Sequence, residues 1–231
     1  MKIANPKISE VYTMKYIDLS HTIFDGLITY KGLPAPVICD FLSREDSKSR
    51  YAEGTSFQIG HIDMVANTGT YLDCPFHRYE DGRDLSEIHL HEVAGLSGIV
   101  IRAEGETIIT NEFFQGKELE GKAVLVHTGW SRHWNTENYF EGHPFLTEEA
   151  AQYLKDKGAA LVGIDSHNID DTSRNSRPVH TILLGADIFI VEHLTNLESL
   201  PDEGFLFSAV PPKVKGMGTF PVRAFAYGRF G

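Results

Sequence analysis

Apolar runs of strand length recur along the chain and predict much of its secondary structure. Four of them are apolar at nearly every position, at 98–103, 123–128, 160–164 and 188–191. Such runs are typical of strands covered on both faces, as in the middle of a sheet. A partly alternating run at 57–65 and a short one at 16–19 predict two more strands. Turn-forming and polar residues at 25–36 and 43–54 predict loops, the second of them exposed, whereas 205–226 has β-rich, turn-rich character.

One helix is well marked, at residues 147–157. Thr147 is a good N-cap, and two glutamates in the first turn suit the positive end of the helix dipole. Gly158 supplies a C-terminal stop. With the strands before and after it, this helix predicts a β-α-β unit whose carboxyl edge lies at Thr128 and Asp165. Ligands of open α/β sheets gather outside that edge, and the whole pattern predicts a mixed α/β fold.

Composition narrows the class of protein. The chain has 231 residues, of which 42% are hydrophobic and 23% charged, which is enough for one large domain, 1–231, without a disulfide or structural metal. The net charge of −11 argues against nucleic acid or an anionic membrane as a partner and leaves a small-molecule substrate. Cys39 and Cys74 are too few for a disulfide framework, and the N-terminus has no signal-like apolar segment. We therefore expect a cytoplasmic protein.

Two sets of residues are candidates for chemistry. Asp73 and His77 flank Pro75, which excludes a helix interior and predicts a bent, extended segment that can point both side chains at one spot. An aspartate and an imidazole can ligate a metal or act together as a general base. An isolated motif of this kind is more often a turn with a surface histidine. Further along, His180 lies twelve residues before Glu192. Glu192 ends an apolar run, where its carboxylate would be costly to bury without a partner.

Residues 67–77 give these candidates a context. They read Asn-Thr-Gly-Thr-Tyr-Leu-Asp-Cys-Pro-Phe-His, which resembles the signature His-x-Gly-Thr-His-x-Asp-x-Pro-x-His of the metal-dependent cyclase/hydrolase family. That family includes bacterial kynurenine formamidase and isatin hydrolase. Five signature positions are present, as Gly69, Thr70, Asp73, Pro75 and His77. Asn67 and Tyr71 stand where the signature has its first two histidines.

Other stretches resemble the same family in the same order. The segments are 18–21, 26–32, 127–130, 161–165 and 216–222. Tyr30 takes the aromatic position of the Gly-Met-Pro-x-aromatic-x-Gly loop, and Trp130 ends the Thr-Gly-Trp element. Both rings are candidates for contact with a substrate, although Trp130 and Trp134, four apart, are equally consistent with packing.

The resemblance implies a fold, an assembly and an activity. The fold is α/β, of the swivelling β/β/α type, with a mixed sheet in a single domain, and the assembly is a homodimer or homotetramer. The activity is hydrolysis of an amide or lactone, a C–N or C–O bond, in a small cyclic or aromatic substrate. The family's second metal site carries over to Asp73, His180 and Glu192, and His77 becomes the base that deprotonates water.

The two replaced histidines leave three alternatives open. Neither Asn67 nor a protonated Tyr71 is a good ligand for a transition ion, so one divalent ion at most, Zn or Mn, is expected, at the second site. Alternatively, the pocket is metal-free, with His77 as the base and Tyr71 or Asn67 as hydrogen-bond donors, and catalyses hydrolysis, proton transfer or elimination. In the third alternative the protein binds a small molecule without turning it over.

Overall fold

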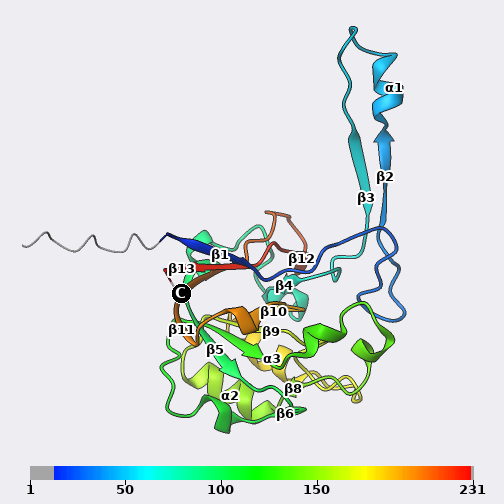
Figure 1. Cartoon of the computed structure of the whole chain (residues 1–231). Coiled ribbons are helices and arrows are strands. Elements are labelled where there is room, and N and C mark those ends of the chain that lie inside the picture. The colour runs from blue at the N-terminus through cyan, green and yellow to red at the C-terminus, as the bar shows by residue number, and fades with distance from the viewer. Residues whose placement is uncertain (1–12, 230–231) are drawn as a thin grey trace, which may run out of the picture.

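The computed structural model describes residues 13–229, which form a nine-stranded mixed sheet with helices beneath it (Figure 1). The strand order is β1-β13-β11-β5-β7-β9-β10-β4-β12. The strands are β1 Lys15–Asp18, β2 Val37–Leu42, β3 Ile59–Asp63, β4 Tyr71–Asp73, β5 Ala94–Arg102, β6 Ile108–Ile109, β7 Ala123–His127, β8 Phe145–Leu146, β9 Leu161–Ile164, β10 Phe189–Glu192, β11 Glu203–Ser208, β12 Thr219–Pro221 and β13 Phe225–Gly228. The α-helices are α1 Arg44–Lys48, α2 Glu148–Asp156 and α3 Pro178–Leu184, and 3₁₀ turns cover Pro75–His77, Leu90–Glu92, Asn111–Phe114, Trp130–His133, Glu137–Phe140 and Leu197–Ser199.

The middle of the sheet is parallel, as the apolar runs predict. Strands β5, β7, β9 and β10 pair in parallel, and antiparallel strands flank them on both sides. The predicted β-α-β unit is confirmed as β7-α2-β9. Thr147 caps α2 by accepting a hydrogen bond from the Ala150 amide, and Gly158 follows the helix with a φ of +70°. Parallel strands end at one edge, so the loops after β7, β9 and β10 meet there.

Each face of the sheet has its own core. On one face, α2 and α3 pack against each other and cover side chains such as Val124, Val162 and Ile190. On the other face, Leu125 and Val191 pack with Phe205 and Phe207 of β11. Alternate residues of the central strands therefore enter different cores, which is why these runs are apolar at almost every position. No helix among residues 13–229 is long and apolar enough to span a membrane.

An arm made of β2, α1 and β3 projects from this body (Figure 1). The predicted strand at 57–65 is confirmed as β3, but it pairs with β2 in the arm and takes no part in the large sheet. The expectation of a loop at 43–54 is wrong in part, because Ser43 caps α1 by accepting a hydrogen bond from the Asp46 amide. Acidic residues in its first turn and Lys48 in its last favour this short helix.

Candidate functional site

The signature turn and β4 deliver Tyr71 and Asp73 to the site. Gly69 has a φ of +68°, a left-handed conformation that side chains with a Cβ rarely adopt. Strand β4 then pairs antiparallel with β10, so that Tyr71 lies opposite Glu192 and Asp73 opposite Ile190. Because side chains alternate along a strand, Tyr71, Asp73 and Glu192 point to the same face.

His77 is oriented by a threonine of β12. Pro75 begins a 3₁₀ turn that ends at His77, so the segment predicted to be extended is in fact helical for one turn, with proline at the first position where its missing N–H costs nothing. The Oγ1 of Thr219 lies 2.8 Å from His77 Nδ1 and also hydrogen-bonds to Asp73 Oδ1. A hydroxyl that donates to the carboxylate accepts from the imidazole N–H, which leaves His77 Nε2 as the basic nitrogen.

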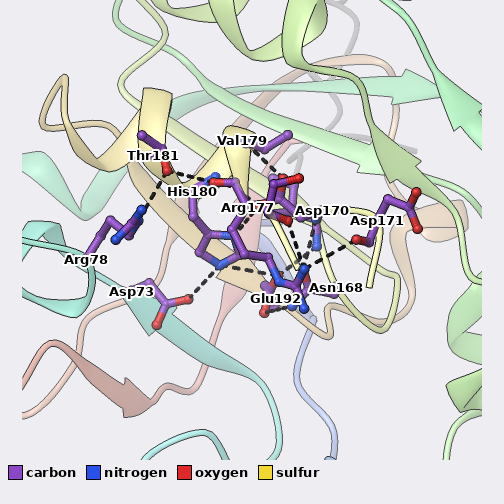
Figure 2. Close-up of polar contacts among 12 residues, drawn as sticks. Asp73, Arg78, Asn168, Asp170, Asp171, Arg177, Val179, His180, Thr181 and Glu192 are labelled. Atoms are coloured by element: carbon purple, nitrogen blue, oxygen red, sulfur yellow. Dashed lines mark hydrogen bonds and ion pairs between the residues drawn. The ribbon is translucent and has the colours of Figure 1, made fainter. Parts of the chain in front are cut away.

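His180 lies on α3 between three carboxylates (Figure 2). Its Nδ1 hydrogen-bonds to Asp170 Oδ2 at 2.6 Å, so its Nε2 faces Asp73 Oδ2 at 3.7 Å and Glu192 Oε1 at 3.8 Å. Burial lowers the pKa of His180, but the hydrogen bond to Asp170 and the nearby Asp73 and Glu192 outweigh it and raise the pKa to about 10. His180 is therefore an imidazolium that balances the buried carboxylates unless a cation takes the place of its proton.

Glu192 is fully buried and surrounded by hydrogen-bond donors. Its Oε2 accepts from the Tyr71 hydroxyl at 2.5 Å, with Tyr30 Oη at 3.2 Å and Asn168 Nδ2 at 3.4 Å, and its Oε1 accepts from the Ile169 amide at 2.7 Å. Burial, and then the charge of Glu192, raise the pKa of Tyr71 well above its usual value. Tyr71 therefore stays protonated and donates a hydrogen bond to Glu192, so the Tyr71 hydroxyl is a poor metal ligand.

A cavity of about 870 Å³ opens over these groups. Of the residues predicted for the site, those that line it are Tyr30, Asn67, Tyr71, His77, His180 and Glu192. Asp73 lies beneath them with no exposed surface. Trp130 does not line the cavity either, and its Nε1 donates instead to the Tyr139 carbonyl at 3.0 Å. The structure thus brings residues of β4 together with residues of α3 and β10 that lie more than a hundred positions further along the sequence.

The site fits one metal ion. Asp73 Oδ2 is buried and has no hydrogen-bond partner in the described part of the chain. Around an ion with bonds of about 2.0–2.2 Å, ligand atoms lie roughly 3.4 Å apart, close to the two distances from His180 Nε2 given above. Among residues 13–229, ligand atoms of Asp73, His77 and His180 all lie within 4.8 Å of one another, and Glu192 adjoins this group at His180. The replaced positions, Asn67 and Tyr71, offer no comparable set for a second ion.

Sequence reasoning missed three residues that position the site. Thr219 orients His77, Asp170 holds His180, and Asn168 donates to Tyr30 Oη at 2.8 Å. Asp170 and Asn168 follow the carboxyl end of β9, where the β-α-β pattern already predicted a ligand edge, so a signal for them existed. Thr219 lies within the stretch 216–222 that resembles the family, but nothing in the sequence places it at the site, because β12 reaches the site only through pairing with β4.

Comparison with known proteins assigns the chain to a family. The family model described as a putative cyclase matches residues 17–171. The kynurenine formamidase of Bacillus cytotoxicus is 29% identical over 211 residues, which is 91% of this chain and 96% of that protein. The kynurenine formamidase of Geobacillus thermodenitrificans is 31% identical over 176 residues, 75% of this chain and 81% of that one.

Solved structures have the same fold. A potential metal-dependent hydrolase with cyclase activity superposes with a TM-score of 0.78 at 27% identity, covering 95% of this chain and all of the other. Isatin hydrolase A from Labrenzia aggregata superposes with a TM-score of 0.79 at 22% identity over 94% of each chain. The chain belongs to the cyclase family, and its α/β fold is that of the family. The relatives and solved structures named here are hydrolases.

Proposed function

We propose that this protein hydrolyses an amide or lactone bond in a small cyclic or aromatic substrate, with His77 as the base that activates water. One observation carries the proposal: the Asp73–Thr219–His77 chain of hydrogen bonds fixes the imidazole with Nε2 free, beside His180 and on the wall of the cavity. An oriented neutral imidazole is the commonest general base at neutral pH. The named relatives, a kynurenine formamidase and an isatin hydrolase, support amide substrates.

The chain's own groups divide the work. His77 Nε2 accepts the proton of the attacking water and returns it to the leaving nitrogen or oxygen. Asp73 and Thr219 hold the ring in the tautomer that this transfer needs. Of the two residues that replace the signature histidines, Asn67 is the one left to donate to the carbonyl oxygen, because it lines the cavity and the Tyr71 proton is committed to Glu192. The cavity is large enough to enclose a one- or two-ring substrate.

A divalent ion, Zn or Mn, would be held by Asp73, His180 and Glu192. When bound, such an ion polarises a carbonyl and lowers the pKa of water to about 7. The unpartnered Asp73 oxygen and the Asp170–His180 hydrogen bond support the first two of these ligands, since ligating histidines usually donate their second N–H to a carboxylate. Bound metal would displace the proton that His180 carries.

The test combines metal analysis with hydrolysis. Protein purified without chelators is analysed for metal and assayed on formanilide and isatin, which present an open and a cyclic amide. We expect about one ion per chain and turnover of at least one amide. His77→Ala should lower kcat by about 10²–10⁴-fold, the usual contribution of a general base, with metal content unchanged. His89→Ala, at an exposed position, is the matched control. Unchanged kcat in the His77 variant would rule out this role.

A metal-free enzyme on the same scaffold is the second candidate. The hydrogen bonds that Glu192 accepts from Tyr71 and the Ile169 amide, together with the ion pairs of His180, satisfy much of the polar site without any cation. In that case His77 would catalyse a proton transfer or elimination, or the pocket would only bind its ligand. Metal-free protein that keeps full activity after exhaustive chelation would favour the enzyme, and ligand binding without turnover would favour the binder.

A further inference from the structure

A second cavity lies at the carboxyl edge of the sheet, where β5 and β7 end. Its volume is about 460 Å³, and every residue that lines it is polar except Gly129. It shares no lining residue with the cavity over the proposed reaction centre. The loop after β10 reaches it through Thr195, three residues beyond Glu192. The sequence predicted ligands at this edge, and the proposed function leaves this part of the edge unused.

His127, the last residue of β7, is a buried donor in this cavity and is 3% exposed. Its Nδ1 lies 3.2 Å from Nη1 of Arg102, which also pairs with Asp202. Because a guanidinium can only donate, Nδ1 accepts, and the neutral ring carries its proton on Nε2. Oxygens of Asp165 and Glu198 lie 3.9 Å from Nε2, too far for a hydrogen bond. Among residues 13–229 this N–H therefore has no acceptor, which is unusual for a buried donor.

Three charged side chains on the cavity wall have no partner of opposite charge in the described chain. Glu104 and Glu198 approach only the His127 ring, at 3.5 and 3.9 Å. Arg132 donates through Nε to His133 Nε2 at 3.2 Å and forms no ion pair. The wall thus presents two unpaired carboxylates and one unpaired guanidinium, which leaves one negative charge over.

Two residues with left-handed backbone shape the wall around these charges. Gly129 has a φ of +71°, and a Cβ there would lie 3.3 Å from Arg132 Nη1 and 3.7 Å from Glu104 Cγ. Both side chains can approach because glycine has none. Asn196 has a φ of +58° and donates through Nδ2 to the Asp18 carbonyl at 2.8 Å, which leaves its Oδ1 as a further acceptor.

This set of groups complements a ligand that carries both signs of charge. The His127 N–H and the Arg132 guanidinium suit a carboxylate, because hydrogen bonds to charged groups are the strong ones. Glu198 lies beside the same N–H, so the first cation of the ligand must adjoin its carboxylate, as the two groups of an α-amino acid do. Glu104 lies at the Nδ1 side of the ring and supplies the remaining negative charge.

We propose that this second cavity binds a free α-amino acid with a basic side chain. The α-carboxylate accepts hydrogen bonds from His127 Nε2 and Arg132, and the α-ammonium donates to Glu198. The side-chain cation donates to Glu104. This site is independent of the proposed function, because none of its residues takes part in the reaction and binding can be measured without turnover.

Calorimetric titration of the full chain with L-lysine and three analogues tests each contact. We expect L-lysine to bind about 10–100-fold more tightly than 1,5-diaminopentane, which lacks the carboxylate, and than 6-aminohexanoate, which lacks the α-ammonium. L-Norleucine, which lacks the side-chain cation, should bind severalfold more weakly. Equal affinities for L-lysine and any one of these analogues would overturn the assigned ligand class.

Conservative variants locate the binding in this cavity. Glu104→Gln should remove the advantage of L-lysine over L-norleucine, and Glu198→Gln should weaken both ligands by about tenfold or more. Both positions are exposed at the cavity rim, with side chains 54% and 60% exposed, so both variants should fold, which thermal unfolding checks. Glu118→Gln, at an exposed position outside the cavity, is the matched control and should bind as the wild type does.

A chelation control separates this cavity from the reaction centre, because an amino acid can also ligate a metal ion. Affinity for L-lysine should be the same before and after removal of metal. Binding that disappears with the metal, or that survives both Glu104→Gln and Glu198→Gln, would place the amino acid elsewhere and overturn the inference. No detectable binding of L-lysine at millimolar concentration would also overturn it, and the proposed hydrolysis would stand.

Discussion

Tyr71 stands where the family signature has a histidine, and its hydroxyl donates a hydrogen bond to Glu192 instead of ligating a cation. Phenol and imidazole differ here in a decisive way: a neutral imidazole offers a lone pair to a metal, whereas burial keeps the phenol protonated and a donor. One substitution thus removes a ligand and at the same time satisfies a neighbouring carboxylate. Asn67 accompanies it on the same cavity wall.

Restoring both signature histidines should restore a second ion. We predict that Asn67→His with Tyr71→His raises metal content from about one to about two ions per chain, because two imidazoles rejoin Asp73. Elemental analysis of both proteins measures this, and the single Tyr71→Phe variant, which removes the hydroxyl without adding a ligand, is the control. A double variant with unchanged metal content would show that the loss involves more than these two positions.

The C-terminal segment before β12 shows what close approach of two elements requires. A Cβ on Gly218 would lie 2.3 Å from the His77 amide nitrogen and 2.5 Å from its Cα, and the Gly218 carbonyl accepts from the Cys74 amide at 2.8 Å. Only glycine allows β12 to bring Thr219 against His77. The element that orients the base therefore depends on a missing side chain.

Gly218→Ala should accordingly damage both stability and activity. Backbone must move to accept the methyl group, and overpacking of this kind typically costs about 1–3 kcal/mol. Denaturant unfolding gives the stability, and kcat on the best amide reports the displacement of His77. Gly60→Ala, in the arm with open space around it, is the matched substitution and should leave both nearly unchanged. Equal effects at the two positions would contradict this reading of the contact.

At the scale of the whole molecule, buried histidines link the site to acid stability. Burial lowers the pKa of His21 to about 4 and that of His167 to about 3. Between those values and the unfolded value of about 6.5, the unfolded chain binds more protons than the folded one. The stability that these two histidines contribute is therefore kept above pH 6.5 and lost as the pH falls below it.

We predict that the free energy of unfolding, measured by denaturant titration, decreases as the pH is lowered from 7 to 5. The decrease is at most about 1.4 kcal/mol per pH unit for each such histidine. His21→Gln removes one titrating group from its stack on Trp134 and should flatten the dependence. His89→Gln, on the surface, should leave the slope alone. A midpoint that is constant or rises over this range in the wild type would refute the prediction.

The arm is where the predicted homodimer or homotetramer can be tested. An isolated two-stranded ribbon is only marginally stable. In this arm Phe41 is 77% exposed and Ile62 56% exposed, so a second copy of the chain could cover this apolar surface. We predict a dimer or larger assembly by sedimentation, and a shift toward monomer in Phe41→Ser with Ile62→Ser, because these changes remove apolar surface. The wild type sedimenting as a monomer would end this prediction.

The sequence by itself determined the central sheet, the family scaffold and the helix predicted at 147–157, which the structure has at Glu148–Asp156. Each rests on local information: apolar runs report burial on two faces, a cap and a stop bound a helix, and Asp73, Pro75 and His77 lie within a few residues of one another. It also determined the positions of His180 and Glu192, through their spacing in a resemblance rather than through geometry.

Only the tertiary structure decided what those residues contact. Strand pairing put Tyr71 opposite Glu192 and Thr219 beside His77, and both contacts join segments more than a hundred residues apart. Such contacts depend on register and on which strands become neighbours, and neither is written in a local pattern. For the same reason Trp130, a candidate for substrate contact in the sequence, donates instead to the Tyr139 carbonyl.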